Sequence, residues 1–119
     1  MQPDVKDAGY LLDMLEHARG VVQALQDRSV VEYLADENLR LAIERRIEII
    51  GEAANRISTG FQDAHPEIPW RKIVAQRNIL AHEYGEVQAE IIWRVATVSI
   101  PDPIAALEPL IPPLPQAGG

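Results

Sequence analysis

Apolar residues recur every three or four positions along this chain, and most regularly between residues 37 and 58. That stretch places its isoleucines on one side of a helical wheel and most of its charged side chains on the other, which is the pattern of an amphipathic helix. The same spacing predicts helices over residues 4–26, 69–84 and 87–99, and a two-turn helix capped by Ser29. No stretch alternates like a strand, so we expect an all-α fold, an antiparallel helical bundle of four main helices plus short extra helices.

Two glycines and a proline interrupt this helical pattern or mark its boundaries. Gly51 lies inside the long central helix, where glycine costs about 1 kcal/mol relative to alanine, so we expect another helix to approach its backbone closely. Gly60 is predicted to cap the end of that helix, and Pro69 to be the first residue of the next one. Residues 104–110 predict a last helical turn or two.

Length and composition bound the architecture and the compartment. With 119 residues the chain is expected to form a single domain at residues 1–111, followed by a proline-rich tail at 112–119. It has no cysteine, which excludes disulfides and thiolate metal sites and favours a reducing cytoplasm. The N-terminal sequence lacks the features of a secretory signal, and no segment has the roughly 18–20 apolar residues of a membrane span. We therefore predict a cytoplasmic protein with no membrane segment.

Charge limits the kinds of partner. The net charge of −7 argues against a protein that coats nucleic acid over its whole surface. Residues 70–84 differ, because they contain three basic residues and only one acid, Glu83. Within that window Arg71 and Lys72 are either solvated or in contact with phosphate. A small basic site on an acidic body stays open, and an acidic body also suits a basic protein partner.

The segment RNILAHEYG, residues 77–85, gathers several hydrogen-bonding side chains at the end of an aliphatic run. At about 100° per residue, Arg77 and Tyr84 fall nearly in line on a helix, while His82 points about 140° away from Arg77. An unbroken helix cannot aim all three at one small target. Either the helix ends near His82 and the chain turns at Gly85, which we favour, or the groups meet across two copies of the protein.

Two interpretations of this segment are open from spacing alone. Histidine, asparagine and glycine are common where helices end, so the segment can be ordinary capping. In the functional interpretation, Asn78 lies one turn before His82 and orients its ring by hydrogen bonding. The helix dipole then stabilises the charged imidazole, which suits proton transfer near neutral pH.

Other polar and aromatic residues have mainly structural interpretations. His17 and His65 are predicted to lie at the surface, and no metal site is expected, because neither has the second histidine at i+4 that a helical site uses. Glu52 is expected to be a helix-surface acid or a partner for an arginine, with support of a site as the alternative. Trp70 and Trp93 lie in apolar patterns, which favours packing over stacking on a base.

The sequence RNILAHEY fits the pattern of an arginine, four residues, a histidine, any residue and a tyrosine. It resembles the signature of the HepT-like ribonuclease toxins within the all-α HEPN superfamily. The likeness extends to IGEAANRIS, which is similar to that family's Ile-Gly-Glu-Ala helix, to HPEIPW, which resembles its approach to the motif helix, and to IIWRV after it. Order and spacing agree over about Asp7 to Leu110.

The resemblance implies a role for each matched residue. Arg77 and His82 would be the catalytic pair of a metal-independent endoribonuclease toxin without a cofactor, with Asn78 as a supporting neighbour. Tyr84 would be the target of adenylylation by a cognate minimal nucleotidyltransferase antitoxin, in a type VII-like toxin–antitoxin pair. The family typically forms homodimers in which two motifs line a shared cleft. Whether Arg77 works with the His82 of its own chain or of the partner is open.

The chemistry requires few residue types because RNA carries its own nucleophile, the 2′-hydroxyl. His82 can act as base or acid, and Arg77 can clamp the phosphate oxygens through its planar guanidinium. Arg71 and Lys72 are candidate contacts for RNA phosphates. The alternative is a non-catalytic HEPN module for dimerisation or partner binding, in which the polar motif only caps a helix.

Overall fold

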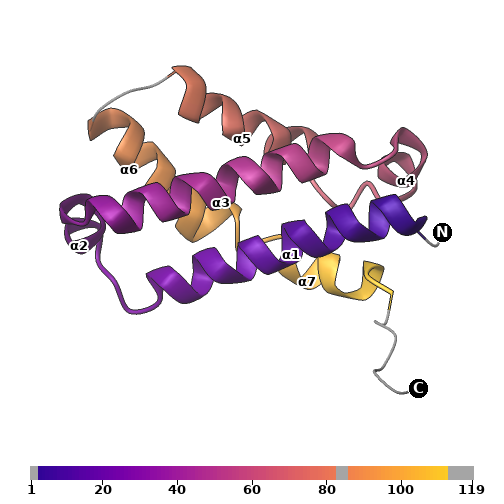
Figure 1. Cartoon of the computed structure of the whole chain (residues 1–119), viewed down its shortest axis with the longest axis horizontal. Helices are drawn as coiled ribbons and strands as arrows, with labels where there is room; N and C mark the ends of the chain where they lie inside the picture. Colours follow the sequence, from indigo (N-terminus) through magenta and orange to yellow (C-terminus); the bar gives the residue numbers. More distant parts are fainter. Residues whose placement is uncertain (1–2, 83–85, 113–119) are drawn as a thin grey trace.

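The computed structural model describes residues 3–82 and 86–112, and of residues 81, 82, 86 and 87 the backbone alone. Every element in these residues is helical, which confirms the predicted all-α class. Figure 1 shows α3 (Glu37–Arg56) in the middle, with α1 (Val5–Leu25) along one side and α5 (Trp70–His82) along the other, and successive long helices antiparallel. The other elements are α2 (Val30–Ala35), α4 (Thr59–Ala64), α6 (Glu86–Arg94), a π-helical turn (Val95–Ser99), α7 (Ile104–Leu107) and a 3₁₀ turn (Glu108–Leu110).

The hydrophobic core lies between α1 and α3 and continues beneath α5 and α6. Leu11, Met14 and Val21 of α1 face Ile43 and Ile47 of α3, and all five side chains are at most 1% exposed. Burying a side chain of this size stabilises a fold by roughly 1.5–3 kcal/mol. The buried positions are those of the predicted apolar stripes, so α3 forms a firm base for the helix that carries Arg77.

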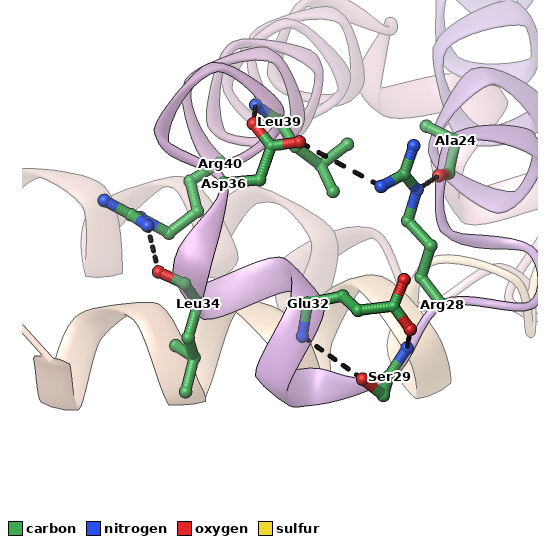
Figure 2. Close-up of polar contacts among 8 residues, drawn as sticks. All are labelled: Ala24, Arg28, Ser29, Glu32, Leu34, Asp36, Leu39 and Arg40. Atoms are coloured by element: carbon green, nitrogen blue, oxygen red, sulfur yellow. Dashed lines mark hydrogen bonds and ion pairs between the residues drawn. The ribbon is translucent and has the colours of Figure 1, made fainter.

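Polar contacts fix the corner where α1 passes through α2 into α3 (Figure 2). The Ser29 hydroxyl accepts the backbone N–H of Glu32 at 3.1 Å, and the Glu32 carboxylate accepts that of Ser29 at 3.2 Å, which forms a capping box. Asp36 caps α3 by accepting a backbone N–H at 3.0 Å. Arg28 donates to the carbonyl of Ala24 at 3.0 Å, which satisfies an acceptor at the end of α1. The predicted cap at Ser29 is confirmed.

The predicted helix end at Gly60 is wrong. α3 ends at Arg56, and Gly60 lies within α4, whose N-cap is Ser58. The Ser58 hydroxyl accepts the backbone N–H of Phe61 at 3.4 Å and donates to the buried carboxylate of Asp7 at 2.6 Å. Because Asp7 belongs to α1, a contact across 51 positions of the sequence fixes where α4 begins.

Two helix boundaries differ in detail from the prediction. Pro69 stands just before α5 rather than inside it, and its carbonyl accepts the N–H of Ile73 at 3.0 Å. The helix predicted over residues 87–99 becomes π-helical after Arg94, where the amide of Ile100 bonds five residues back to Val95 at 2.9 Å. The pattern of apolar residues does not distinguish these two helix types.

The C-terminal boundary of the domain stays a prediction. Ile111 still packs against the core, and Pro112 is the one residue of the predicted tail at 112–119 that the structure describes. Within the described part of the chain, none of the helices combines the length and the apolar composition that a membrane span requires.

Candidate functional site

Arg77 borders a hollow of about 270 Å³ between α3 and α5. Asn78 and Leu80 line it from α5, and Glu48 and Glu52 line it from α3. The arginine is half-buried, whereas Asn78 and Glu52 are exposed. The two motif residues Arg77 and Asn78 therefore share one concave surface, next to two carboxylates.

The position of Arg77 depends on a glycine in α3. A Cβ atom added to Gly51 would lie 3.0 Å from the Cβ of Arg77 and 3.4 Å from the carbonyl oxygen of Ile73. The predicted close approach of a helix to Gly51 is thus confirmed, and the approaching helix is α5. The aliphatic part of the Arg77 side chain lies directly over Gly51. The backbone of α3 at this glycine therefore positions the Arg77 side chain.

Gly51→Ala is expected to lower the free energy of unfolding by about 1–3 kcal/mol, because the new methyl group must push α5 away. Gly9→Ala is the matched control, since a Cβ there meets nothing within 4 Å and alanine gains up to about 1 kcal/mol of helix propensity. Urea unfolding of both variants checks the contrast. Equal stability of the two would contradict the close contact.

The sequence HPEIPW forms the turn that leads into α5. The indole N–H of Trp70 donates to the carbonyl of His65 at 2.9 Å. The centroid of the His65 imidazole lies 4.5 Å from the centroid of the Phe61 phenyl ring. His65 also contacts the Glu67 carboxylate at 3.1 Å. The surface position predicted for His65 is therefore wrong, since its side chain is only 14% exposed. Trp70 packs as predicted, and the turn sets the direction in which α5 starts.

His17 is half-buried and keeps part of its side chain at the surface, as predicted. Its Nδ1 lies 3.1 Å from the guanidinium of Arg46, so it links α1 to α3. Burial, and then the charge of Arg46, lower the pKa of His17. Among the residues whose side chains the structure describes, no group of three or more histidine, aspartate or glutamate side chains is placed to hold a metal ion.

Three neighbouring hollows follow α5 from Arg77 toward the start of the helix. Asn78 lines both the hollow at Arg77 and a second one of about 330 Å³, which shares Trp70 and Arg71 with a third of about 510 Å³. Lys72 lines the third hollow. Arg71 and Lys72 are exposed and line the third hollow together with the acid Asp63. Each of the expected site residues Arg71, Lys72, Arg77 and Asn78 thus lines at least one of these hollows, whereas the side chain of His82 lies outside the described residues.

Sequence reasoning missed Glu48 and placed Glu52 mainly at the helix surface. The two lie four residues apart on α3, the spacing that puts side chains on one face of a helix. The spacing is visible in the sequence, but the sequence does not show which face of α3 packs against α5. Glu48 also pairs with Arg45 at 2.8 Å, so its carboxylate is partly neutralised.

The backbone of α5 bears on how Arg77 and His82 can cooperate. The helix continues through His82, after which residues 83–85 lie outside the described part of the chain, so the predicted helix end near His82 stays a prediction. Five helical steps place the two Cα atoms about 140° apart around the axis. The expected turn at Gly85 and the position of Tyr84 lie outside the described residues.

Comparison with known proteins gives one consistent result. A family model described as ribonuclease HepT-like matches residues 14–110. A candidate RNase of Methanocaldococcus jannaschii is 35% identical over 98 residues, covering 82% of this chain and 88% of the relative. A probable ribonuclease HepT of Thermococcus cleftensis is 34% identical over 92 residues, covering 77% and 84%. No solved structure gives a significant match.

Proposed function

We propose, since the chain belongs to the ribonuclease HepT-like family, that it is an endoribonuclease whose reaction centre is built from Arg77 and His82. The observation that carries the proposal is the family match over residues 14–110, which includes both residues. The place of Arg77 at a hollow on α5, beside Asn78, supports it.

In the proposed reaction, the 2′-oxygen of the substrate attacks the adjacent phosphorus and the bond from phosphorus to the 5′-oxygen breaks. His82 takes the proton of the 2′-hydroxyl or gives one to the leaving 5′-oxygen. Arg77 stabilises the negative charge on the phosphorane through paired N–H donors. These steps require no metal ion.

The three hollows along α5 give the RNA strand a path. Asn78 supports the reaction centre, and Arg71 and Lys72 bind phosphates at the hollow farthest from Arg77. Because the rest of the protein is acidic, with a net charge of −7, these cations are local anchors. Glu48 and Glu52 repel phosphate at the other edge of the hollow at Arg77, which favours one position of the backbone beside Arg77.

The products of cleavage test the mechanism. RNA incubated with the protein in EDTA is expected to yield fragments with 2′,3′-cyclic phosphate and 5′-hydroxyl ends, because the 2′-hydroxyl is the nucleophile. DNA of the same sequence is expected to resist cleavage. Fragments with 3′-hydroxyl ends, or a requirement for magnesium, would exclude this mechanism. No cleavage by the folded protein would favour the non-catalytic module for dimerisation or partner binding.

The proposed assembly is a homodimer in a type VII-like toxin–antitoxin pair. The angle of about 140° between Arg77 and His82 on one helix supports a site completed by a second copy. The partner would be a minimal nucleotidyltransferase antitoxin that adenylylates Tyr84. Co-expression with that partner, followed by intact-mass measurement, checks the modification; it should add whole adenylyl groups to the chain but not to Tyr84→Phe.

A further inference from the structure

A pocket of about 480 Å³, separate from the three hollows along α5, lies between α2, α3 and α6. It has no role in the mechanism above. Its polar groups come from Tyr33, Arg40, Glu44 and Gln88, and Leu34 and Leu41 add apolar surface. We call it the α2/α3/α6 pocket. Pockets for small molecules combine apolar lining with a few polar groups that fix the orientation of the ligand.

The hydroxyl group of Tyr33 lacks a hydrogen-bond partner among the residues that the structure describes, although the side chain is fully buried. Leaving such a group unpaired is costly, so a polar ligand atom beside it would be stabilised. Burial, and then the charge of Glu44, raise the pKa of Tyr33 to about 12. Burial also raises the pKa of the Glu44 carboxyl, which a ligand with N–H donors would offset.

The pocket adjoins the proposed reaction centre. Glu44 in the pocket and Glu48 and Glu52 at the hollow follow one another at intervals of four residues along one stripe of α3. Glu44 and Glu52 are therefore about 12 Å apart along the axis. Gln88 of α6 donates to the carbonyl of Leu80 in α5 at 3.4 Å, which joins a wall of the pocket to the hollow.

We propose that the α2/α3/α6 pocket binds a guanine base of the RNA strand whose phosphate lies at Arg77. The inference rests on the proposed function. Single-stranded RNA is read in this way, by a base that leaves the stack and forms hydrogen bonds along its edges. The pocket thereby sets which phosphodiester bond is presented for cleavage.

Guanine fits the donors and acceptors of the pocket better than the other bases. Its Watson–Crick edge carries two adjacent N–H donors, which one carboxylate such as Glu44 can accept together. Each other base presents an acceptor beside its donor, and this acceptor would face the carboxylate. Guanine also has two acceptors, O6 and N7, which are the usual targets of arginine.

Arg40 and Tyr33 can supply those donors. The guanidinium of Arg40 already bonds the carbonyl of Leu34, as Figure 2 shows, and that contact holds it at the pocket. Four further N–H groups remain on a guanidinium, which has five. Glu37 also lines the pocket, and its charge disfavours entry of a phosphate in place of the base.

Nucleotide binding tests the pocket without reference to cleavage. At a concentration ten times its Kd, GMP is expected to raise the Tm of the wild type by roughly 4 °C or more. AMP, CMP and UMP at the same concentration should have less than half this effect. Tyr33→Phe should be as stable as the wild type, because it removes an unpaired hydroxyl, and should respond less to GMP. Equal Tm shifts with all four nucleotides would overturn the proposal. So would a rise in Tm with arginine amide, a cation that could pair with the carboxylates of the pocket, if GMP gave none.

Cleavage of oligonucleotides that contain a single guanine tests the same pocket in the reaction. The wild type is expected to cut at a fixed offset from the guanine about tenfold faster than at other bonds. Glu44→Gln should lose this preference, so that it cuts the bond at the fixed offset from the guanine no faster than other bonds. Glu90→Gln is the matched control, because Glu90 is an exposed carboxylate on α6 outside the pocket. This variant should keep the preference for guanine.

The two experiments separate the pocket from the proposed function. Selective binding of GMP without cleavage would contradict the ribonuclease and leave the base pocket in place. Cleavage with no preference for guanine, and no selective response to GMP, would contradict the pocket and leave the ribonuclease in place.

Discussion

Arg77→Ala and His82→Ala are each expected to lower the rate of RNA cleavage by about 10²–10⁴-fold. In the proposed mechanism Arg77 stabilises the negative charge of the phosphorane, and loss of one such donor typically costs 10²–10³-fold. In the same mechanism His82 transfers the proton, and general acid–base catalysis contributes about 10²–10⁴-fold. Initial rates on a labelled oligonucleotide measure both losses, with folding checked by circular dichroism.

Arg77→Lys separates charge from geometry. Lysine keeps the positive charge and an aliphatic stem that can lie over Gly51, but it lacks the planar fork that binds two phosphate oxygens. We expect an intermediate loss of rate with unchanged stability. Arg56→Ala, at the exposed C-terminal end of α3, is the matched control and should retain full activity. Unchanged cleavage in both Arg77→Ala and His82→Ala would refute the catalytic assignment.

The sequence predicts those parts of the fold that are decided locally. The long helices and the cap at Ser29 follow from apolar spacing and from a capping box within four residues. Gly51 was also informative, because a glycine inside a strong helix requires a compensating contact. In each case the signal and the structure it determines lie within the same few turns of the chain.

The features that were missed depend on contacts between distant segments. Gly60 fails as a helix end because Ser58 bonds Asp7, which belongs to another helix. Glu48 enters the candidate site only because α5 crosses that face of α3. Tyr33 reads as one more member of an apolar stripe, and only the packed structure places this residue in the wall of a pocket and leaves its hydroxyl without a partner among the described residues. Periodicity identifies the buried face of a helix but not the helix that will cover it.

Mixed dimers are expected to show that each reaction centre takes Arg77 from one subunit and His82 from the other. In a dimer of Arg77→Ala with His82→Ala, one of the two shared sites keeps both residues, so about half the wild-type activity should remain. A site built within one chain would leave none, because each subunit lacks one of the two groups. Differently tagged subunits, co-expressed and purified through both tags, give this dimer free of its parents.

The reciprocal dimer reverses the outcome and so serves as the control. When a wild-type subunit pairs with an Arg77→Ala/His82→Ala subunit, each shared site lacks one residue and activity should be almost absent. A site within one chain would instead keep about half. The angle of about 140° between the two positions on α5 is the reason to expect the shared arrangement, because residues on opposite faces of one helix can meet at one phosphate when a second copy supplies the missing group. If both mixed dimers keep the activity expected of sites within one chain, each subunit builds its own site from Arg77 and His82, and the shared arrangement is refuted.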